Sequence, residues 1–111
     1  MDNAAVNLDR ITVYEIIKDM HKALEKYGIK DNHIALFGSF LNDNYHRNSD
    51  IDMIIISDSF EGKNLFERID MTLRAESDVR SRHIVPMDIL LKTPQEYTYS
   101  KEAYFNSEII V

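Results

Sequence analysis

Three aspartates placed in apolar segments are the residues of this chain best suited to chemistry. Asp50 and Asp52 lie at the start of the apolar run Ile51–Ile56, and Asp88 lies within the apolar segment Val85–Leu91. Burying an unpaired carboxylate is costly, so three acids in the most apolar stretches suggest that they bind a cation together. Mg²⁺ prefers oxygen ligands, and the absence of cysteine excludes a thiolate zinc site.

The spacing of the first two aspartates suits such a site. Residues two apart leave the same face of a strand, with Cα atoms about 6.6 Å apart. Asp50 and Asp52 can therefore close on one Mg²⁺ ion, or on two ions about 3.5–4 Å apart. Asp88 joins them if its strand lies beside theirs. An isolated Asp-x-Asp pair is usually only solvated, so the prediction depends on all three acids.

A Gly-Ser turn, Gly38-Ser39, directly follows the apolar segment His33–Phe37. Glycine lets a backbone approach a phosphate closely. Serine offers a hydroxyl and an amide N–H, at a position that could begin a helix and so favour an anion. Together with the acids, the turn predicts a nucleoside triphosphate held with Mg²⁺ beside a catalytic carboxylate.

These residues need a scaffold, and the apolar pattern predicts one. Apolar residues recur at three- and four-residue steps near the N-terminus, which is typical of an amphipathic helix. They are Tyr14, Ile17, Met20, Leu24 and Tyr27. Gly28 suits the left-handed conformation that ends a helix. Strands are predicted at residues 33–37, 51–56 and 83–92.

A second helix is predicted to begin at Asp58 or Ser59. Its core-facing stripe would consist of Leu65, Phe66, Ile69 and Leu73. Residues 76–82 read as a charged loop or a fraying helix end, and Thr93 with Glu96 forms a capping box that starts a third helix. The order predicts the α/β (α+β) class, a small mixed sheet with helices packed on it.

Length and composition indicate a single domain spanning residues 1–111, with 44% apolar and 29% charged residues. The formal net charge of -6 argues against free-standing nucleic-acid binding and against electrostatic binding to membranes. No apolar run reaches the roughly 20 residues of a membrane helix, and no signal peptide is visible. The absence of cysteine, and therefore of disulfides, fits the cytoplasmic location that we expect. The apolar end Glu108–Val111 either docks on the core or marks a truncated chain.

The combined motifs resemble those of the minimal nucleotidyltransferases, within the superfamily that includes DNA polymerase beta. Gly38-Ser39, about ten further residues and then Ser49-Asp50-Ile51-Asp52 before an apolar strand match the family pattern in identity and spacing. Asp88 falls where the third acid is expected. The resemblance covers roughly residues 10–105 and implies the nucleotidyltransferase fold.

The resemblance implies a role for each of these residues. Asp50 and Asp52 would hold two Mg²⁺ ions that bracket the triphosphate. Asp88 would share the catalytic metal and help to deprotonate the attacking hydroxyl, while Gly38 and Ser39 would contact the β- and γ-phosphates. The enzyme would be a phosphotransferase that moves a nucleoside monophosphate, with ATP as the favoured donor among the nucleoside triphosphates, to a hydroxyl of an unknown acceptor.

One departure and the small size of the chain leave alternatives open. Many members have an arginine shortly after the Gly-Ser turn, where this chain has Asn42, so Arg47 or Lys92 would have to supply that charge. Minimal members often pair with a helical HEPN-domain protein as antitoxin to toxin, and some add AMP to it. The chain is thus expected to be an active nucleotidyltransferase, or a weakly catalytic or non-catalytic antitoxin or assembly subunit. Its partner would be a HEPN-type protein or another copy. A third reading is a subunit that binds ATP without turnover.

Overall fold

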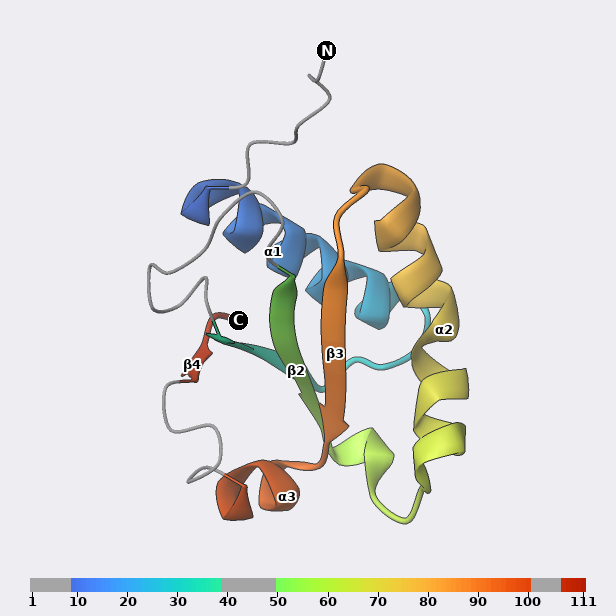
Figure 1. The fold of residues 1–111 in the computed structure, drawn as a ribbon. Coiled ribbons are helices and arrows are strands. Elements are labelled where there is room, and N and C mark those ends of the chain that lie inside the picture. Colours follow the sequence, from blue (N-terminus) through green and yellow to red (C-terminus); the bar gives the residue numbers. More distant parts are fainter. Residues whose placement is uncertain (1–8, 39–49, 101–106) are drawn as a thin grey trace.

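The computed structural model describes residues 9–38, 50–100 and 107–111. The element order is α1 (Arg10–Lys26), β1 (Asn32–Phe37), β2 (Ile51–Ser57), a short 3-10 helix (Asp58–Phe60), α2 (Leu65–Arg82), β3 (Met87–Lys92), α3 (Pro94–Tyr99) and β4 (Glu108–Ile109) (Figure 1). The predicted α/β class with a mixed sheet is confirmed. Among the described residues, no helix is both long and apolar enough to cross a membrane.

The sheet has four strands in the order β3-β2-β1-β4. β2 runs parallel to β3 and antiparallel to β1, and β4 runs antiparallel to β1. In this register Asp52 of β2 lies opposite Asp88 of β3 on one side and Phe37 of β1 on the other. Ile109 of β4 pairs with Ala35 of β1, so the last described residues dock on the sheet, as in one of the two alternatives given above.

Side chains alternate between two faces of this sheet. The main core lies between one face and the helices α1 and α2, and it includes Ile34 and Leu36 of β1 with Met53 and Ile55 of β2. The opposite face carries a smaller apolar cluster of Ala35, Ile54 and Ile56, against which Phe37, Leu90 and Tyr97 pack. By this alternation, Asp52 and Asp88 lie on the second face, next to the apolar cluster and nearer the start of β2 and β3.

Helix α1 follows its prediction closely. Its buried residues are Val13, Ile16, Ile17, Met20, Ala23 and Leu24, and Tyr14 packs partly buried against the core. Asp9 caps its first turn by accepting a hydrogen bond from the Thr12 backbone N–H at 2.8 Å. Gly28 has a φ of +102°, the left-handed conformation expected after the helix, whereas Tyr27 at the C-cap is exposed.

Helix α2 begins and ends later than predicted. Its N-cap is Asn64, which forms a capping box with Glu67, and not Asp58 or Ser59. Those two residues belong instead to the short 3-10 helix, where Asp31 accepts hydrogen bonds from the Asp58 N–H and the Ser59 hydroxyl. Residues 76–82 are the last turns of α2, and β3 begins four residues later than predicted, at residue 87.

The predicted core-facing stripe of the second helix is wrong. Leu65, Phe66, Ile69 and Leu73 are all exposed. The residues that α2 buries are Thr72, Ala75 and Val79. These side chains are small, so they let α2 approach its neighbours closely. Met71 packs partly buried against the core, whereas the four residues of the predicted stripe are exposed.

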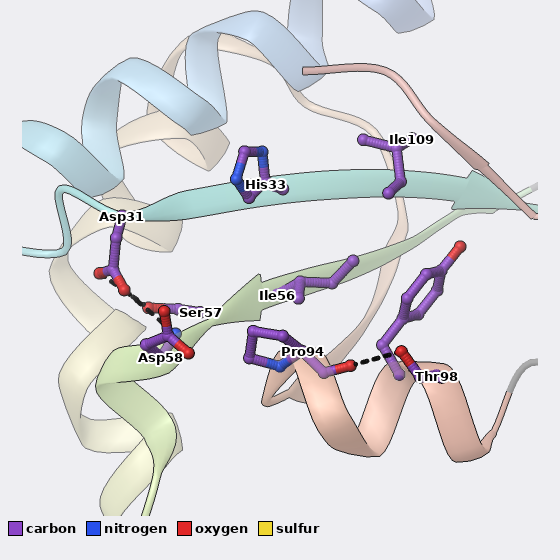
Figure 2. Close-up of a pocket in the computed structure, with 9 residues that line it drawn as sticks. Asp31, His33, Ile56, Ser57, Asp58, Pro94, Thr98 and Ile109 are labelled. Atoms are coloured by element: carbon purple, nitrogen blue, oxygen red, sulfur yellow. Dashed lines mark hydrogen bonds between the residues drawn. The ribbon is translucent and has the colours of Figure 1, made fainter.

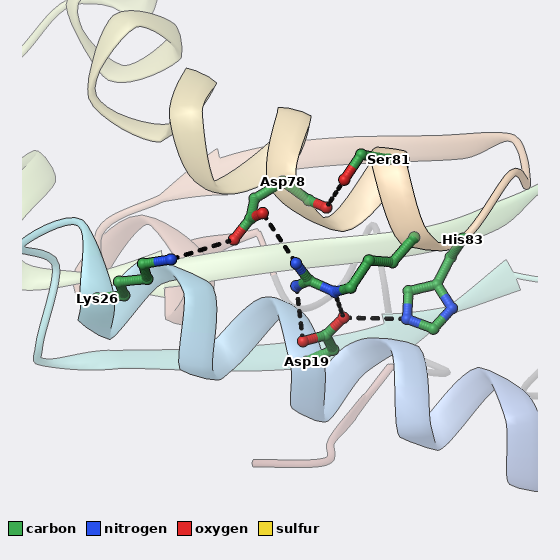
Figure 3. Close-up of polar contacts among 6 residues, drawn as sticks. Asp19, Lys26, Asp78, Ser81 and His83 are labelled. Atoms are coloured by element: carbon green, nitrogen blue, oxygen red, sulfur yellow. Dashed lines mark hydrogen bonds and ion pairs between the residues drawn. The ribbon is translucent and has the colours of Figure 1, made fainter.

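Polar side chains join the C-terminal half of α2 to α1 (Figure 3). Arg82 donates to both oxygens of Asp19, at 3.0 and 2.9 Å, and to Asp78 at 2.8 Å. His83 Nε2 lies 3.0 Å from the same Asp19 carboxylate. Partial burial opposes ionisation of Asp19, but the hydrogen bonds from Arg82 and His83 outweigh it and keep the pKa of Asp19 below its usual value.

A second polar link ties the start of α2 to β3 and α3. Arg68 donates to both oxygens of Glu96, at 2.6 and 3.1 Å, and to the Leu91 carbonyl at 3.2 Å. Glu96 also completes the predicted capping box with Thr93. The hydrogen bond from Arg68, followed by the one from the Thr93 backbone, lowers the pKa of Glu96 to about 2.

This pKa predicts how Glu96→Gln changes stability with pH. The replacement keeps the capping box, because glutamine can occupy that position, but removes the charge that pairs with Arg68. Since the Glu96 side chain is 44% exposed, we expect a loss of about 1 kcal/mol of unfolding free energy at neutral pH. Because the pKa of Glu96 is lower in the folded protein than its ordinary value of 4.5, the ionised carboxylate stabilises the fold. The loss of stability in Glu96→Gln should therefore be complete above pH 4.5 and should shrink as the pH falls towards 2. Urea unfolding at several pH values tests this, and a pH-independent loss would contradict it.

Candidate active site

The sheet register brings two of the predicted site residues together. Asp52 and Asp88 lie directly opposite each other on adjacent parallel strands, which run about 4.8 Å apart. Directly paired residues project to the same face, so the two carboxylates share one surface of the sheet. Asp50 lies one residue before β2 and is exposed, and its even spacing from Asp52 places it towards the same face. The three aspartates thus lie on one side of the sheet near the start of β2 and β3.

Gly38 fits closely against one of these carboxylates. It follows β1 directly and has a φ of +79°, a conformation that side chains rarely adopt. A Cβ atom built on Gly38 would lie 3.0 Å from Cγ of Asp52 and would clash with its Oδ2. Sequence reasoning assigned Gly38 to phosphate binding and missed this contact, because nothing in the sequence fixes the register of β1 against β2.

The electrostatics of the site are those of crowded negative charge. Asp52 is half-buried, and burial is the main cause that raises its pKa above the ordinary 3.8. The nearby charges of Asp88 and then Asp50 raise it further. A group of like charges of this kind favours binding a proton or a cation.

The donor set fits a hard divalent cation. All three candidate ligands are carboxylates, and oxygen donors are what Mg²⁺ prefers. In the described part of the chain, no three histidine, cysteine or acidic side chains converge tightly enough to enclose a metal ion. Mg²⁺ usually takes only a few carboxylates and completes its coordination with water and substrate phosphates, so the protein does not need to enclose it.

Several residues named from the sequence lie outside the described ranges. These are Ser39, Asn42, Arg47 and Ser49. Lys92, one of two candidates for the missing positive charge, lies opposite Ile56 in the register of β2 and β3. Lys92 lies four residues after Asp88, which is about 13 Å along the strand. It therefore lies on the same face of the sheet as Asp88 but at the other end of β3.

A separate cavity of about 380 Å³ lies at that opposite end (Figure 2). Ile56, Pro94 and Ile109 supply its apolar wall, and Asp31 and His33 lie at its margin. The carboxylate of Asp31 is already engaged, because the Ser57 hydroxyl, the Asp58 N–H and the Ser59 hydroxyl all donate to it. None of the three aspartates lines this cavity, so it is distinct from the three-aspartate site.

Comparison with known proteins identifies one family and several solved structures of the same fold. The family model of the nucleotidyltransferase domain matches residues 13–110. A solved structure from Sulfolobus solfataricus, assigned as a nucleotidyltransferase, shares 17% identity at a TM-score of 0.68, with 90% of this chain and 80% of that chain covered. A toxin–antitoxin structure with AMP-PNP shares 18% identity at a TM-score of 0.58, covering 86% of this chain and 72% of that one.

A second toxin–antitoxin structure, a mutant of MntA–HpeT with two aspartates changed to glutamate, shares 16% identity at a TM-score of 0.57, with 86% and 72% covered. No protein of curated function matches the sequence significantly. The solved structures show the same fold, and the family model covers nearly the whole chain. The chain belongs to the nucleotidyltransferase domain family.

Proposed function

We propose that this chain is a Mg²⁺-dependent nucleotidyltransferase that moves a nucleoside monophosphate, AMP from ATP, to a hydroxyl of an acceptor. The observation that carries the proposal is the placement of Asp52 directly opposite Asp88, with Gly38 packed against the Asp52 carboxylate. The raised pKa of Asp52 supports it, because crowded carboxylates are arranged for cation binding and not for stability.

In the proposed reaction, an acceptor hydroxyl oxygen attacks the α-phosphorus of the nucleotide. A new oxygen–phosphorus bond forms as the bond to the β-phosphate breaks, and pyrophosphate leaves. Asp88 accepts the proton of the hydroxyl, while Gly38 and Ser39 bind the β- and γ-phosphates. Asp50, Asp52 and Asp88 would hold two Mg²⁺ ions. When bound, these ions would neutralise the charge of the phosphates during transfer.

The proposed acceptor belongs to a partner protein. Two of the solved structures with this fold are toxin–antitoxin structures, one of them with AMP-PNP and one altered at two aspartates two positions apart, the spacing of Asp50 and Asp52. These neighbours support an antitoxin role. The partner that we propose is a helical HEPN-type protein, and the proposed location is the cytoplasm. We propose, as a second candidate, that the chain binds its partner with little or no catalysis, since Asn42 stands where many members have an arginine.

Calorimetric titration with each nucleoside triphosphate, in Mg²⁺ and in EDTA, tests the proposed site. We expect ATP to bind in Mg²⁺ only, and both Asp50→Asn and Asp88→Asn to weaken binding at least tenfold, because each removes a ligand charge. Asp58→Asn is the matched control, since Asp58 is exposed in the short 3-10 helix just beyond the opposite end of β2.

The outcomes of this titration separate the two candidates. ATP binding that is lost in both site variants and kept in the control supports the nucleotidyltransferase. If the folded protein binds no nucleotide with Mg²⁺, the catalytic proposal is wrong for the chain alone, and the partner-binding candidate is favoured. Circular dichroism of every variant establishes that the fold is intact.

A further inference from the structure

The order of the strands determines the side from which an acceptor can reach the proposed active site. Gly38 follows β1, two of the aspartates come next at the start of β2, and Asp88 lies in β3, which is the outermost strand on that side of the described sheet. In the proposed reaction, Gly38 binds the part of the nucleotide that leaves as pyrophosphate. An in-line displacement requires the attacking oxygen to enter opposite the leaving group, so the acceptor hydroxyl approaches from the β3 side.

An open hollow of about 330 Å³ lies on that side of the site. It is formed by the end of α2 and the loop that leads into β3, and its lining residues are Arg80, His83, Ile84, Val85 and Pro86. Figure 1 shows this loop at the end of the sheet where β2 and β3 begin. The Pro86 carbonyl accepts a hydrogen bond from the Ile51 N–H at 2.9 Å, directly beside Asp50. The hollow therefore adjoins the three-aspartate site.

Arg80 gives this hollow a positive charge. Arg68 and Arg82, which are also on α2, are paired with carboxylates. Within residues 9–38, 50–100 and 107–111, Arg80 forms no ion pair, and its guanidinium makes a long hydrogen bond of 3.5 Å to the Met87 carbonyl. Met87 directly precedes Asp88, the proposed proton acceptor. Because a guanidinium suits a carboxylate partner, Arg80 can bind an anionic group of the acceptor beside Asp88.

The rest of the hollow is largely apolar. Ile84 is 86% exposed, and Val85 and Pro86 extend its surface towards β3. His83 adds a second basic side chain, which is already held by Asp19. A positive charge next to an apolar wall complements an acidic side chain with an apolar neighbour. The volume lies at the lower end of the range for ligand pockets, so it fits a few side chains of a peptide. The net charge of -6 disfavours a nucleic acid as the occupant.

We infer that this hollow binds the acceptor as an acidic peptide segment of a partner protein. The inference rests on the proposed function and names the chemistry of its acceptor. An aspartate or glutamate of the segment pairs with Arg80, an apolar neighbour packs on Ile84 and Val85, and the accepting hydroxyl reaches Asp88. Arg80 contacts the residue before Asp88, and an extended chain advances about 3.3 Å per residue, so the acid lies one or two positions from the hydroxyl residue. Arg80 is thus a specificity-determining residue.

Short synthetic peptides test this inference. Each peptide has a serine, threonine or tyrosine two positions from a variable residue, with a valine between them, and the variable residue is glutamate, glutamine or lysine. Transfer of labelled AMP from ATP in Mg²⁺ gives kcat/KM for each peptide. For the hydroxyl residue that the enzyme uses, we expect the glutamate peptide to exceed the lysine peptide by about tenfold or more. The difference should appear in KM and not in kcat, because the charge pair forms when the peptide binds.

Charge reversal separates recognition of the acceptor from a structural role. Arg80→Glu should reverse the preference, so that the lysine peptide becomes the better acceptor, whereas Arg80→Lys, which keeps the charge, should keep the glutamate preference. A loss of stability would lower transfer to every peptide and could not reverse their order. Arg74→Glu is the matched control, because Arg74 is exposed on the same helix about 9 Å nearer its start. Its peptide preference should equal that of the wild type.

Calorimetric titration of the same proteins with ATP and Mg²⁺ distinguishes this inference from the proposed function. A wild type that does not bind ATP with Mg²⁺ contradicts the proposed function, and this inference with it. If ATP binds but no peptide accepts AMP, or if the glutamate peptide is not preferred to the lysine peptide, this inference alone is wrong. A preference that persists in Arg80→Glu, or that shifts equally in Arg74→Glu, also overturns it, because the selecting charge then lies elsewhere.

Discussion

Gly38→Ala is expected to reduce Mg²⁺-dependent nucleotide affinity by ten- to a hundredfold while leaving the protein folded. The added Cβ would clash with Oδ2 of Asp52 and lie 3.0 Å from its Cγ. A short carboxylate side chain can rotate away from this clash, so the fold survives. The carboxylate then leaves the position it holds opposite Asp88, and the proposed metal site loses a correctly placed ligand.

Gly62→Ala is the matched control for this prediction. Gly62 has a φ of +75°, close to the +79° of Gly38, but a Cβ built on it meets no atom within 4 Å. Both variants should lose about 1 kcal/mol of unfolding free energy, because alanine is strained in the left-handed region. Calorimetry should then separate them, with nucleotide affinity lost in Gly38→Ala alone. Equal affinities in the two variants would show that the contact between Gly38 and Asp52 does not matter for binding.

The positions of Asp50, Asp88 and Gly38 relative to Asp52 show how far the sequence could predict the site. Alternation along β2 predicted that Asp50 and Asp52 share a face, because that depends on chain geometry alone. The pairing of Asp52 with Asp88 depends on β3 lying next to β2 and on the register between them; adjacency is an assumption in the sequence analysis, and the structure shows both. The contact with Gly38 depends on the register between β1 and β2, which no local pattern specifies.

The second helix shows why the fold was predicted only in part. Apolar periodicity identified α1 correctly, because that helix buries its large apolar side chains. In α2 the same signal pointed to the wrong face, since Ala75 and Val79 make the core contacts and Phe66 is exposed. Periodicity detects a surface that avoids water, but it does not distinguish packing within the chain from packing against another molecule.

Capping shows the same limit on a smaller scale. Thr93 and Glu96 were predicted correctly as a capping box, because the motif is local and adjoins a proline. Asp58 and Ser59 have the right residue types for an N-cap, yet Asp31, which is far away in sequence, accepts their hydrogen bonds and closes a separate turn. A long-range partner therefore decided where α2 begins.

Asp52→Asn is expected to abolish the proposed nucleotidyl transfer and, at the same time, to stabilise the metal-free protein. The replacement removes a carboxylate whose pKa is raised by burial and by the charges of Asp88 and Asp50. Relief of that repulsion should add about 0.5–1 kcal/mol to the unfolding free energy at neutral pH. Activity should fall by several orders of magnitude in a pyrophosphate-release assay, because a ligand of the proposed metal is lost.

The pH dependence of this stabilisation follows from the sign of the shift. Because the folded pKa of Asp52 lies above the ordinary 3.8, ionising it destabilises the wild-type fold. The advantage of Asp52→Asn should therefore be complete above the folded pKa and vanish as the pH falls to 3.8. Urea unfolding between neutral pH and that value measures it. Asp70→Asn, an exposed acid on α2, should show no such advantage.

Mg²⁺ provides a test of the same residue that does not require turnover. A cation held among Asp50, Asp52 and Asp88 offsets their repulsion, so Mg²⁺ should raise the unfolding midpoint of the wild type. It should do so much less for Asp52→Asn, whose advantage should therefore disappear at saturating Mg²⁺. An equal shift of both proteins by Mg²⁺ would show that the cation binds elsewhere. A variant that is less stable than the wild type in EDTA would show that Asp52 serves the fold and not a metal site.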